Sequence, residues 1–144
     1  MASVSTYLNF DGKTEEAFEF YKSVFGTEYV GGIFRMGDMP PQEGMEPTPD
    51  HLKNLVMNVQ LPITGGHLLM GTDTVSEWGH ELKLGNNVSI MLQPGSREEA
   101  DRLFAELSAG GSVQMPMADQ FWGDYYGALT DAFGIQWMIA YTGK

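Results

Sequence analysis

Histidine is the side chain best suited to proton transfer near neutral pH, and the sequence contains three. His51 ends a proline-rich segment and could reach a bound molecule if that segment closes. His67 alternates with apolar neighbours, so we expect it at a solvated strand end, facing away from any groove. His80 has Glu77 and Glu81 at spacings that could chelate a cation on a helix, but we interpret this run as a solvated charged turn. His51 remains as a candidate base.

A second candidate group lies near the C-terminus. Asp124 and Tyr126 are two positions apart in a strand-like segment, so they share one face with Trp122. A carboxylate and a phenol on one face could move protons on a bound substrate. The aromatic residues of this segment could equally serve only to pack the sheet. The sequence has no cysteine, which excludes thiolate catalysis, disulfides and cysteine metal sites.

A repeat indicates which elements position these residues. Two segments carry apolar residues with the spacing of an amphipathic helix. They are Ala17, Phe20, Tyr21 and Val24, and Ala100, Leu103, Phe104 and Leu107. Strand-like runs precede the two helices at 7–10 and 88–92. Three more strands are expected after each helix: at 28–36, 55–61 and 67–70 after the first, and at 112–117, 122–130 and 134–141 after the second. The sequence therefore predicts two strand–helix–three-strand modules.

The modules are expected to share one domain of 144 residues. Module one covers about 1–73, a polar linker about 74–85, and module two about 86–144. Between Met36 and His51 lie four of the seven prolines without any periodicity, which predicts a long loop. Such a loop could be a binding lid or only a surface excursion.

The charge balance restricts the class of partner. Eight basic residues against 19 acidic ones give a net charge of −11, which disfavours nucleic acids and anionic membranes. No run approaches the length of a transmembrane helix, and the first residues lack the regions of a signal peptide. We therefore expect a soluble cytoplasmic protein.

The order of the modules and three motifs resemble the vicinal oxygen chelate superfamily, which includes glyoxalase I, bleomycin-resistance proteins and extradiol dioxygenases. The motifs are Tyr7-Leu8-Asn9-Phe10-Asp11-Gly12, Phe121-Trp122, and Phe133-Gly134-Ile135-Gln136-Trp137-Met138-Ile139. More narrowly they resemble its PhnB-like branch, some members of which carry a 3-demethylubiquinone methyltransferase label. The resemblance implies an α+β fold in which two βαβββ modules form a curved, incompletely closed mixed sheet around a groove, with the helices outside. It also implies a homodimer.

The resemblance bears on metal binding. Metal-using members place His, Gln or Glu on the first and last strands of each module. The last-strand counterparts here are Met70 and Met138, and the first strands, 4–10 and 87–93, contain no His, Asp or Glu. Thioether is a weak ligand for hard divalent cations and zinc. We therefore predict no catalytic metal and no cofactor.

Strand alternation within this fold predicts the lining of the groove. The expected ligand-binding residues are Tyr7, Asn9, Asn58, Met70, Ser89, Met91, Trp122, Tyr126, Gln136 and Met138. Aromatic, amide and methionine side chains suit a flat or flexible organic ligand, although Met70 and Met138 could be ordinary core residues. The leading hypothesis is metal-free binding of a small organic molecule. The alternative is an enzyme of the same superfamily, with a glyoxalase-like lyase or isomerase activity or a methyltransferase-labelled activity. Such an enzyme would use Asp124, Tyr126 or His51 for proton transfer, or it would hold a divalent metal at a site not yet placed. A purely structural or interaction role is the third possibility.

Overall fold

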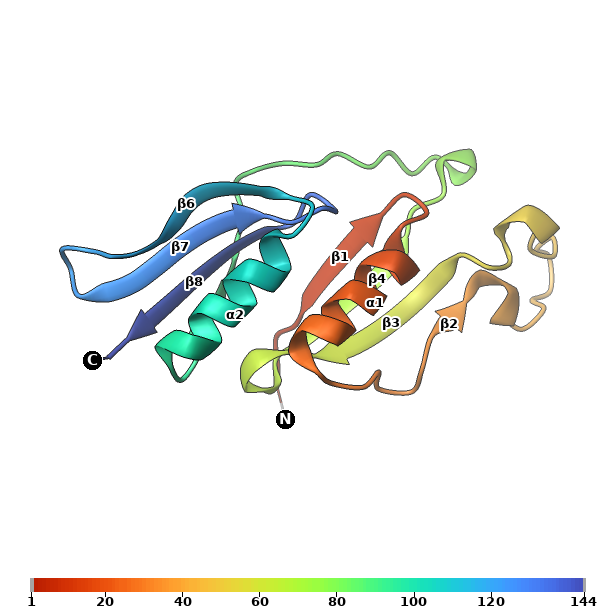
Figure 1. Cartoon of the computed structure of the whole chain (residues 1–144). Helices are drawn as coiled ribbons and strands as arrows, with labels where there is room; N and C mark the ends of the chain where they lie inside the picture. Colours follow the sequence, from red (N-terminus) through yellow and green to blue (C-terminus); the bar gives the residue numbers. More distant parts are fainter. Residues whose placement is uncertain (1, 144) are drawn as a thin grey trace. The chain divides into compact units, whose positions relative to one another are not determined.

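The computed structural model describes residues 2–143 and divides the chain into two compact units, Met1–Leu82 and Lys83–Lys144. The first unit consists of β1 (Thr6–Phe10), α1 (Thr14–Phe25), β2 (Phe34–Arg35), β3 (Val56–Pro62) and β4 (Leu68–Asp73). Its four strands form one mixed sheet in the order β1-β4-β3-β2, with β1 parallel to β4 and the other pairs antiparallel. Helix α1 covers one face of this sheet (Figure 1).

Helix α1 forms where the sequence repeats apolar residues at helical spacing, with Glu15 and Glu16 in its first turn. Ala17, Phe18, Tyr21 and Val24 are buried against the sheet. The helix approaches the sheet so closely that a Cβ at Gly71, in the middle of β4, would lie 2.5 Å from the ring of Phe18. Glycine at this position is therefore part of the helix–sheet packing.

The second unit repeats this arrangement. It consists of β5 (Ile90–Leu92), α2 (Arg97–Ser108), β6 (Ser112–Asp119), β7 (Asp124–Thr130) and β8 (Gln136–Thr142). The sheet order is β5-β8-β7-β6, with β5 parallel to β8 and the other pairs antiparallel. The strand–helix–three-strand prediction is thus confirmed in both units.

Helix α2 begins at a conventional cap and buries the expected stripe. The hydroxyl of Ser96 accepts a hydrogen bond from the backbone N–H of Glu99 at 3.1 Å, which satisfies one of the free donors of the first turn. Ala100, Leu103 and Leu107 are buried on one side of the helix. They pack with the buried side chains of β7 and β8, which include Leu129, Trp137 and Ile139.

Three element predictions need correction. The strand expected over 28–36 exists only at Phe34–Arg35, because Gly31 and Gly32 take positive φ values of 77° and 76° and turn the chain away from an extended path. The strand expected over 88–92 begins only at Ile90, and Val88 lies before β5 outside any strand and is 74% exposed. Trp122 lies in the turn before β7 rather than within the strand.

The segment between β2 and β3 has a small core of its own. Two short 3-10 helices, η1 (Met36–Asp38) and η2 (Asp50–Leu52), bracket it. Met36, Leu52 and Val75 form a buried cluster against which Met39, Leu55 and Met57 pack. Two further 3-10 turns, η3 (Thr64–Gly66) and η4 (Ser76–Trp78), flank β4. Within residues 2–143, none of the helices is both long and apolar enough to cross a membrane.

Candidate functional site

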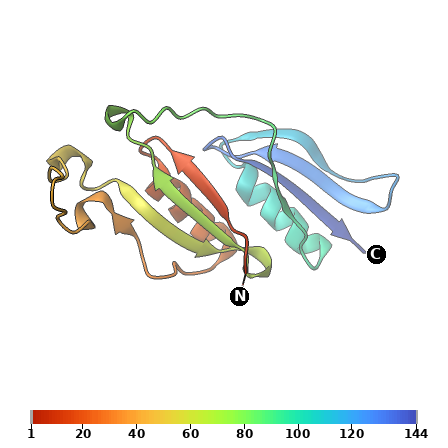
Figure 2. The same ribbon diagram turned by 180° about the vertical axis from the view of Figure 1, so that it is seen from behind.

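The sheet of the first unit has one face that its helix does not cover, and Figure 2 views this sheet from that side. Along β1 the side chains alternate: Leu8 and Phe10 are buried, whereas Tyr7 and Asn9 are exposed. In the register of the sheet, Tyr7 lies beside Met70. Three of the predicted ligand-binding residues therefore share this face, and Asn58 on β3 is the fourth.

Side-chain hydrogen bonds join these residues. The Asn58 amide donates to the Tyr7 hydroxyl at 3.3 Å, and the Gln60 amide donates to the Asn58 carbonyl oxygen at 3.4 Å. Gln60 is paired with Met70 in the sheet. We call Tyr7, Asn9, Asn58, Gln60 and Met70 the first open face. It offers an aromatic ring, a thioether and oriented amides to a ligand.

The corresponding face of the second unit carries the methionine pair that the sequence predicted. Met91 on β5 lies beside Met138 on β8, and Ala128 on β7 lies on the other side of Met138. Met91 is 48% exposed and Met138 is half-buried. Tyr126 is paired with Ala140 on the same face. These residues do not pack under α2, so they are not simply core methionines of the helix–sheet interface.

An aromatic and acidic cluster stands at the edge of this face. The Trp122 and Tyr126 ring centroids lie 6.0 Å apart, and the exposed ring of Phe121 stands 5.0 Å from that of Trp122. The indole N–H of Trp122 donates to Asp124 at 3.1 Å, and the hydroxyl of Thr142 donates to the other Asp124 oxygen at 2.5 Å. We call Met91, Trp122, Asp124, Tyr126, Gln136 and Met138 the second open face.

Two predicted lining residues are less available. The Gln136 amide donates to the backbone oxygens of Gly85 at 3.4 Å and Val88 at 3.2 Å, so it anchors the segment before β5. Ser89 is half-buried and precedes β5 rather than lying within it. Both are less exposed than Trp122 and Tyr7.

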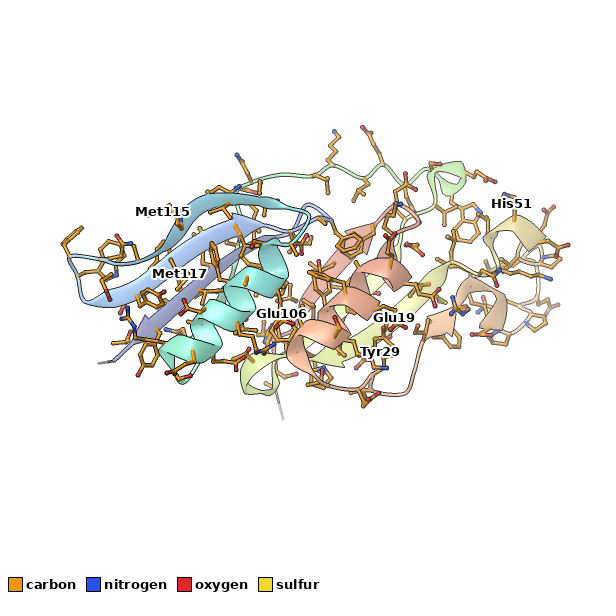
Figure 3. The ribbon with its side chains drawn as sticks, viewed as in Figure 1. Glu19, Tyr29, His51, Glu106, Met115 and Met117 are labelled. Carbon is orange, nitrogen blue, oxygen red and sulfur yellow. The ribbon has the colours of Figure 1, made fainter. Side chains whose placement is uncertain are left out.

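The candidate proton-transfer residues belong to different units of the chain. His51 belongs to the first unit, where its Nε2 atom lies 2.8 Å from a carboxylate oxygen of Glu77 (Figure 3). Asp124 and Tyr126 belong to the second unit. Asp124 accepts one hydrogen bond at each oxygen, which fixes its orientation and leaves further lone pairs that could accept a proton.

The other histidines have structural partners. His67 Nε2 lies 2.9 Å from the hydroxyl of Thr6, which alternates with Tyr7 and so lies off the first open face. His80 Nδ1 accepts a hydrogen bond from the backbone N–H of Val75 at 3.2 Å.

The donor atoms present do not fit a metal ion. The open faces offer thioethers, amides, phenols and the single carboxylate of Asp124, whereas divalent cations need several carboxylate or imidazole ligands. In the described part of the chain, no three His, Cys, Asp or Glu side chains come together in a group that could hold a metal. No step of a reaction is therefore assigned to a metal.

Two features of the site were not found from the sequence. The bond between Thr142 and Asp124 follows from their pairing at the open end of the β7–β8 hairpin, which pattern alone could have suggested. The cavity in segment 37–53 has no periodic signal and required the structure.

The model of one protein family, 3-demethylubiquinone-9 3-methyltransferase, matches residues 2–140. Protein YjdN of Escherichia coli K12 is 29% identical over 141 residues, which cover 94% of this chain and 92% of that protein. The crystal structure of protein PA1353 from Pseudomonas aeruginosa is 32% identical with a TM-score of 0.84, and each chain is covered completely. A putative 3-demethylubiquinone-9 3-methyltransferase, PhnB protein, from Bacillus cereus is 26% identical with a TM-score of 0.75, covering 98% of this chain and all of that one.

A more distant likeness concerns the fold alone. The fosfomycin resistance protein FosX of Listeria monocytogenes, solved with Mn(II) and a dihydroxypropylphosphonic acid, is 14% identical with a TM-score of 0.64 and covers 99% of this chain and 92% of its own. This likeness confirms the glyoxalase/bleomycin-resistance fold predicted from the two modules. The chain belongs to the 3-demethylubiquinone-9 3-methyltransferase family, in the PhnB-like branch of the vicinal oxygen chelate superfamily.

Proposed function

We propose that this chain binds a small organic molecule on its open sheet faces, and that it does so without a metal ion. The observation that carries the proposal is the cluster of Trp122, Tyr126 and Asp124, in which an exposed indole and a phenol stand beside a carboxylate whose position is fixed by two donors. Trp122 is 51% exposed, although burial of an indole would be favourable. A flat ligand ring would bury this surface.

The first open face supports the same chemistry. Tyr7 is 47% exposed, and its hydroxyl is oriented by the Asn58 amide, which is itself oriented by Gln60. Amides held in this way can fix the orientation of a ligand that carries carbonyl or hydroxyl groups. Met70 and Met91 add thioethers that adapt to irregular shapes. The proposed ligand is therefore a ring compound with polar substituents, such as a quinone or quinol.

The binding test uses Trp122 as its reporter. The chain has three tryptophans, of which Trp137 is fully buried and Trp78 is 45% exposed. In a Trp78→Phe background, a panel of benzoquinones and benzoquinols is titrated while tryptophan emission is recorded. We expect saturable one-to-one quenching that Trp122→Phe abolishes, together with recovery of the unchanged compound. A response that persists in Trp122→Phe, or no saturable response to the panel, would reject the proposal.

Catalysis by the same face is the second candidate, because Asp124 and Tyr126 lie on one side of β7 next to the aromatic rings. If the chain is an enzyme, it converts the bound compound into a product. If the reaction is the methyl transfer named in the family's description, the assay must also contain a methyl donor. Asp124→Asn and Tyr126→Phe would then abolish turnover while binding persists. Conversion that is unaffected by both variants would exclude proton transfer by these residues.

We propose in addition that the protein is a homodimer, as the resemblance to its superfamily implies, and that it is cytoplasmic, as expected from its sequence. Size-exclusion chromatography with light scattering decides the assembly, since one chain has a mass of 15.9 kDa. A particle of twice this mass supports the dimer, and a particle of one chain rejects it.

A further inference from the structure

The segment between β2 and β3 encloses a cavity of about 390 Å³ that belongs to neither open face. This size lies within the range of pockets that hold small organic molecules, roughly 300–1,000 Å³. The cavity is lined by Gly37, Met39, Pro40, Pro41, Gln42, Met45, Glu46, Pro47, Thr48 and Lys53. None of these residues lies on a strand, so the cavity is formed by the segment itself.

The segment is held in place by backbone hydrogen bonds at its two ends. Met36 N–H donates to the Leu55 carbonyl at 2.8 Å, and Gly37 N–H donates to the Lys53 carbonyl at 3.0 Å. The backbones approach so closely that a Cβ at Gly37 would lie 2.9 Å from the Cβ of Lys53. Beneath them lies the buried cluster of Met36, Leu52 and Val75. The cavity is therefore attached to a packed part of the first unit.

The walls and the rim of the cavity differ in chemistry. Met39, Met45 and the prolines supply apolar surface, and methionine adapts its shape to an irregular ligand. Glu46 and Lys53 both line the cavity, and the ammonium group of Lys53 is already paired with Asp50 at 2.9 Å. An anionic ligand would have to displace this pair and would also meet the Glu46 carboxylate, whereas a cation would lose its hydration against the apolar walls. An uncharged ligand has neither cost.

We propose that this cavity is a second small-molecule site and that it accepts an uncharged, largely apolar organic compound. Thr48 is fixed at the rim, since its hydroxyl donates to the Met36 carbonyl at 3.4 Å. Met45 is 65% exposed although it is one of the largest apolar side chains of the lining. A ligand in the cavity would cover Met45. The site is independent of the open faces, so either can be present without the other.

The first test uses N-phenyl-1-naphthylamine, an uncharged probe with a naphthyl and a phenyl group, whose fluorescence rises in apolar surroundings. We expect one saturable site per chain in the intact protein. Met45→Asp places a carboxylate against the apolar wall and should weaken binding at least about tenfold. Met115→Asp is the matched control, because Met115 is an exposed methionine on β6 that does not line the cavity (Figure 3). It should bind as the wild type does.

Other outcomes of this titration would reject the cavity as a binding site. Absence of saturable binding, or equal binding by Met45→Asp and wild type, would reject the proposed site. Loss of binding in Trp122→Phe but not in Met45→Asp would place the probe on the second open face, which rejects the cavity while leaving the proposed function intact.

The second test needs no variant and so does not depend on whether Met45→Asp folds. Dilute hydrogen peroxide converts exposed methionines to sulfoxides, which peptide mass spectrometry locates. With saturating probe, we expect oxidation of Met39 and Met45 to slow at least about threefold while Met115 is oxidised at an unchanged rate. Equal rates at Met45 with and without the probe would overturn the proposal.

Discussion

Asp73, the last residue of β4, holds the first residue of α1, Thr14, through two hydrogen bonds. One oxygen of the buried carboxylate accepts from the backbone N–H of Thr14 at 3.1 Å and from its hydroxyl at 2.7 Å. The other oxygen accepts from the backbone N–H of Val56 at 2.8 Å. A single side chain thus joins the start of the helix to two strands of the sheet.

Replacing Asp73 with alanine should strongly destabilise the first unit. The change leaves three buried donors without their acceptor and should lower the free energy of unfolding by about 3 kcal/mol or more. Urea denaturation followed by circular dichroism measures this difference. Asp11→Ala is the control, because Asp11 is exposed at the turn before α1. Equal effects of the two substitutions would contradict the anchoring role of Asp73.

In the second unit, Trp137→Phe should also be costly. The indole N–H donates to the buried carboxylate of Asp131 at 2.8 Å, and the side chain is fully buried. Loss of the donor and of part of the volume should lower the free energy of unfolding by about 2–3 kcal/mol. Trp78→Phe, at a 45% exposed tryptophan, should change it by less than about 0.5 kcal/mol. A similar value for both variants would argue against this contact.

Two tyrosines should respond in opposite ways to loss of their hydroxyl. The buried hydroxyl oxygen of Tyr29 has no hydrogen-bond partner among residues 2–143, and burial, aided by the nearby Glu19 carboxylate, raises its pKa (Figure 3). Tyr29→Phe should therefore leave the stability unchanged or raise it. The Tyr125 hydroxyl donates to Asp101 at 2.5 Å, and Arg97 stacks on its ring.

Tyr125→Phe should lower the free energy of unfolding by about 1 kcal/mol, because it removes this bond to a carboxylate. Paired urea titrations compare the variants. Destabilisation by Tyr29→Phe as large as that by Tyr125→Phe would show that Tyr29 makes a polar contact in solution.

The ion pair of Glu15 and Arg35 should make stability depend on pH in the acid range. Both guanidinium nitrogens donate to the carboxylate, at 3.0 and 2.8 Å, and this hydrogen bonding holds the pKa of Glu15 below its usual value. A carboxyl group with a lowered folded-state pKa stabilises the fold above its unfolded pKa, about 4.3, and this contribution is lost as the pH falls through the folded pKa.

Glu15→Gln should therefore destabilise at pH 7 by less than about 1 kcal/mol, because the pair is partly solvated. The difference from wild type should shrink as the pH falls below about 4. Glu16→Gln is the control, since Glu16 approaches only Lys13, at 3.6 Å between two exposed side chains. A difference that is constant from pH 7 to pH 3 would contradict the assignment.

Metal content tests the chemistry of the open faces. After incubation with Zn, Ni, Mn, Fe and Mg and removal of unbound ions, elemental analysis should find far less than one metal per chain, because thioethers and amides are weak ligands for these ions. Near-stoichiometric retention that survives His80→Ala would contradict this prediction and would favour a metalloenzyme.

The sequence predicted the helices and the two-module order well because these depend on local periodicity. Ala17, Tyr21 and Val24 of the predicted stripe are buried as expected, whereas Phe20 is only half-buried and Phe18 is buried in addition. Helix α1 ends before Gly26. The alternation in β1 also correctly separated Tyr7 from Leu8. Each of these features follows from side-chain spacing within a single element.

Features that depend on pairing between distant segments were harder to predict. The late start of β5 depends on its pairing with β8 from Ile90 onward, which no periodicity in the sequence records. Asp73 resembles a polar residue of the linker in the sequence, and only the structure shows that it caps α1. The lining of the open faces remains a prediction for ligand binding, although the structure shows that Tyr7, Asn58 and Met70 share one face.

The two buried carboxylates show that the two modules are not stabilised in the same way. Asp73 lies at the end of β4, whereas Asp131 lies in the turn that leads into β8 and accepts from Phe133, Ile135 and Trp137. They are not equivalent positions of the two modules. A substitution tolerated in one module therefore need not be tolerated at the matching position of the other.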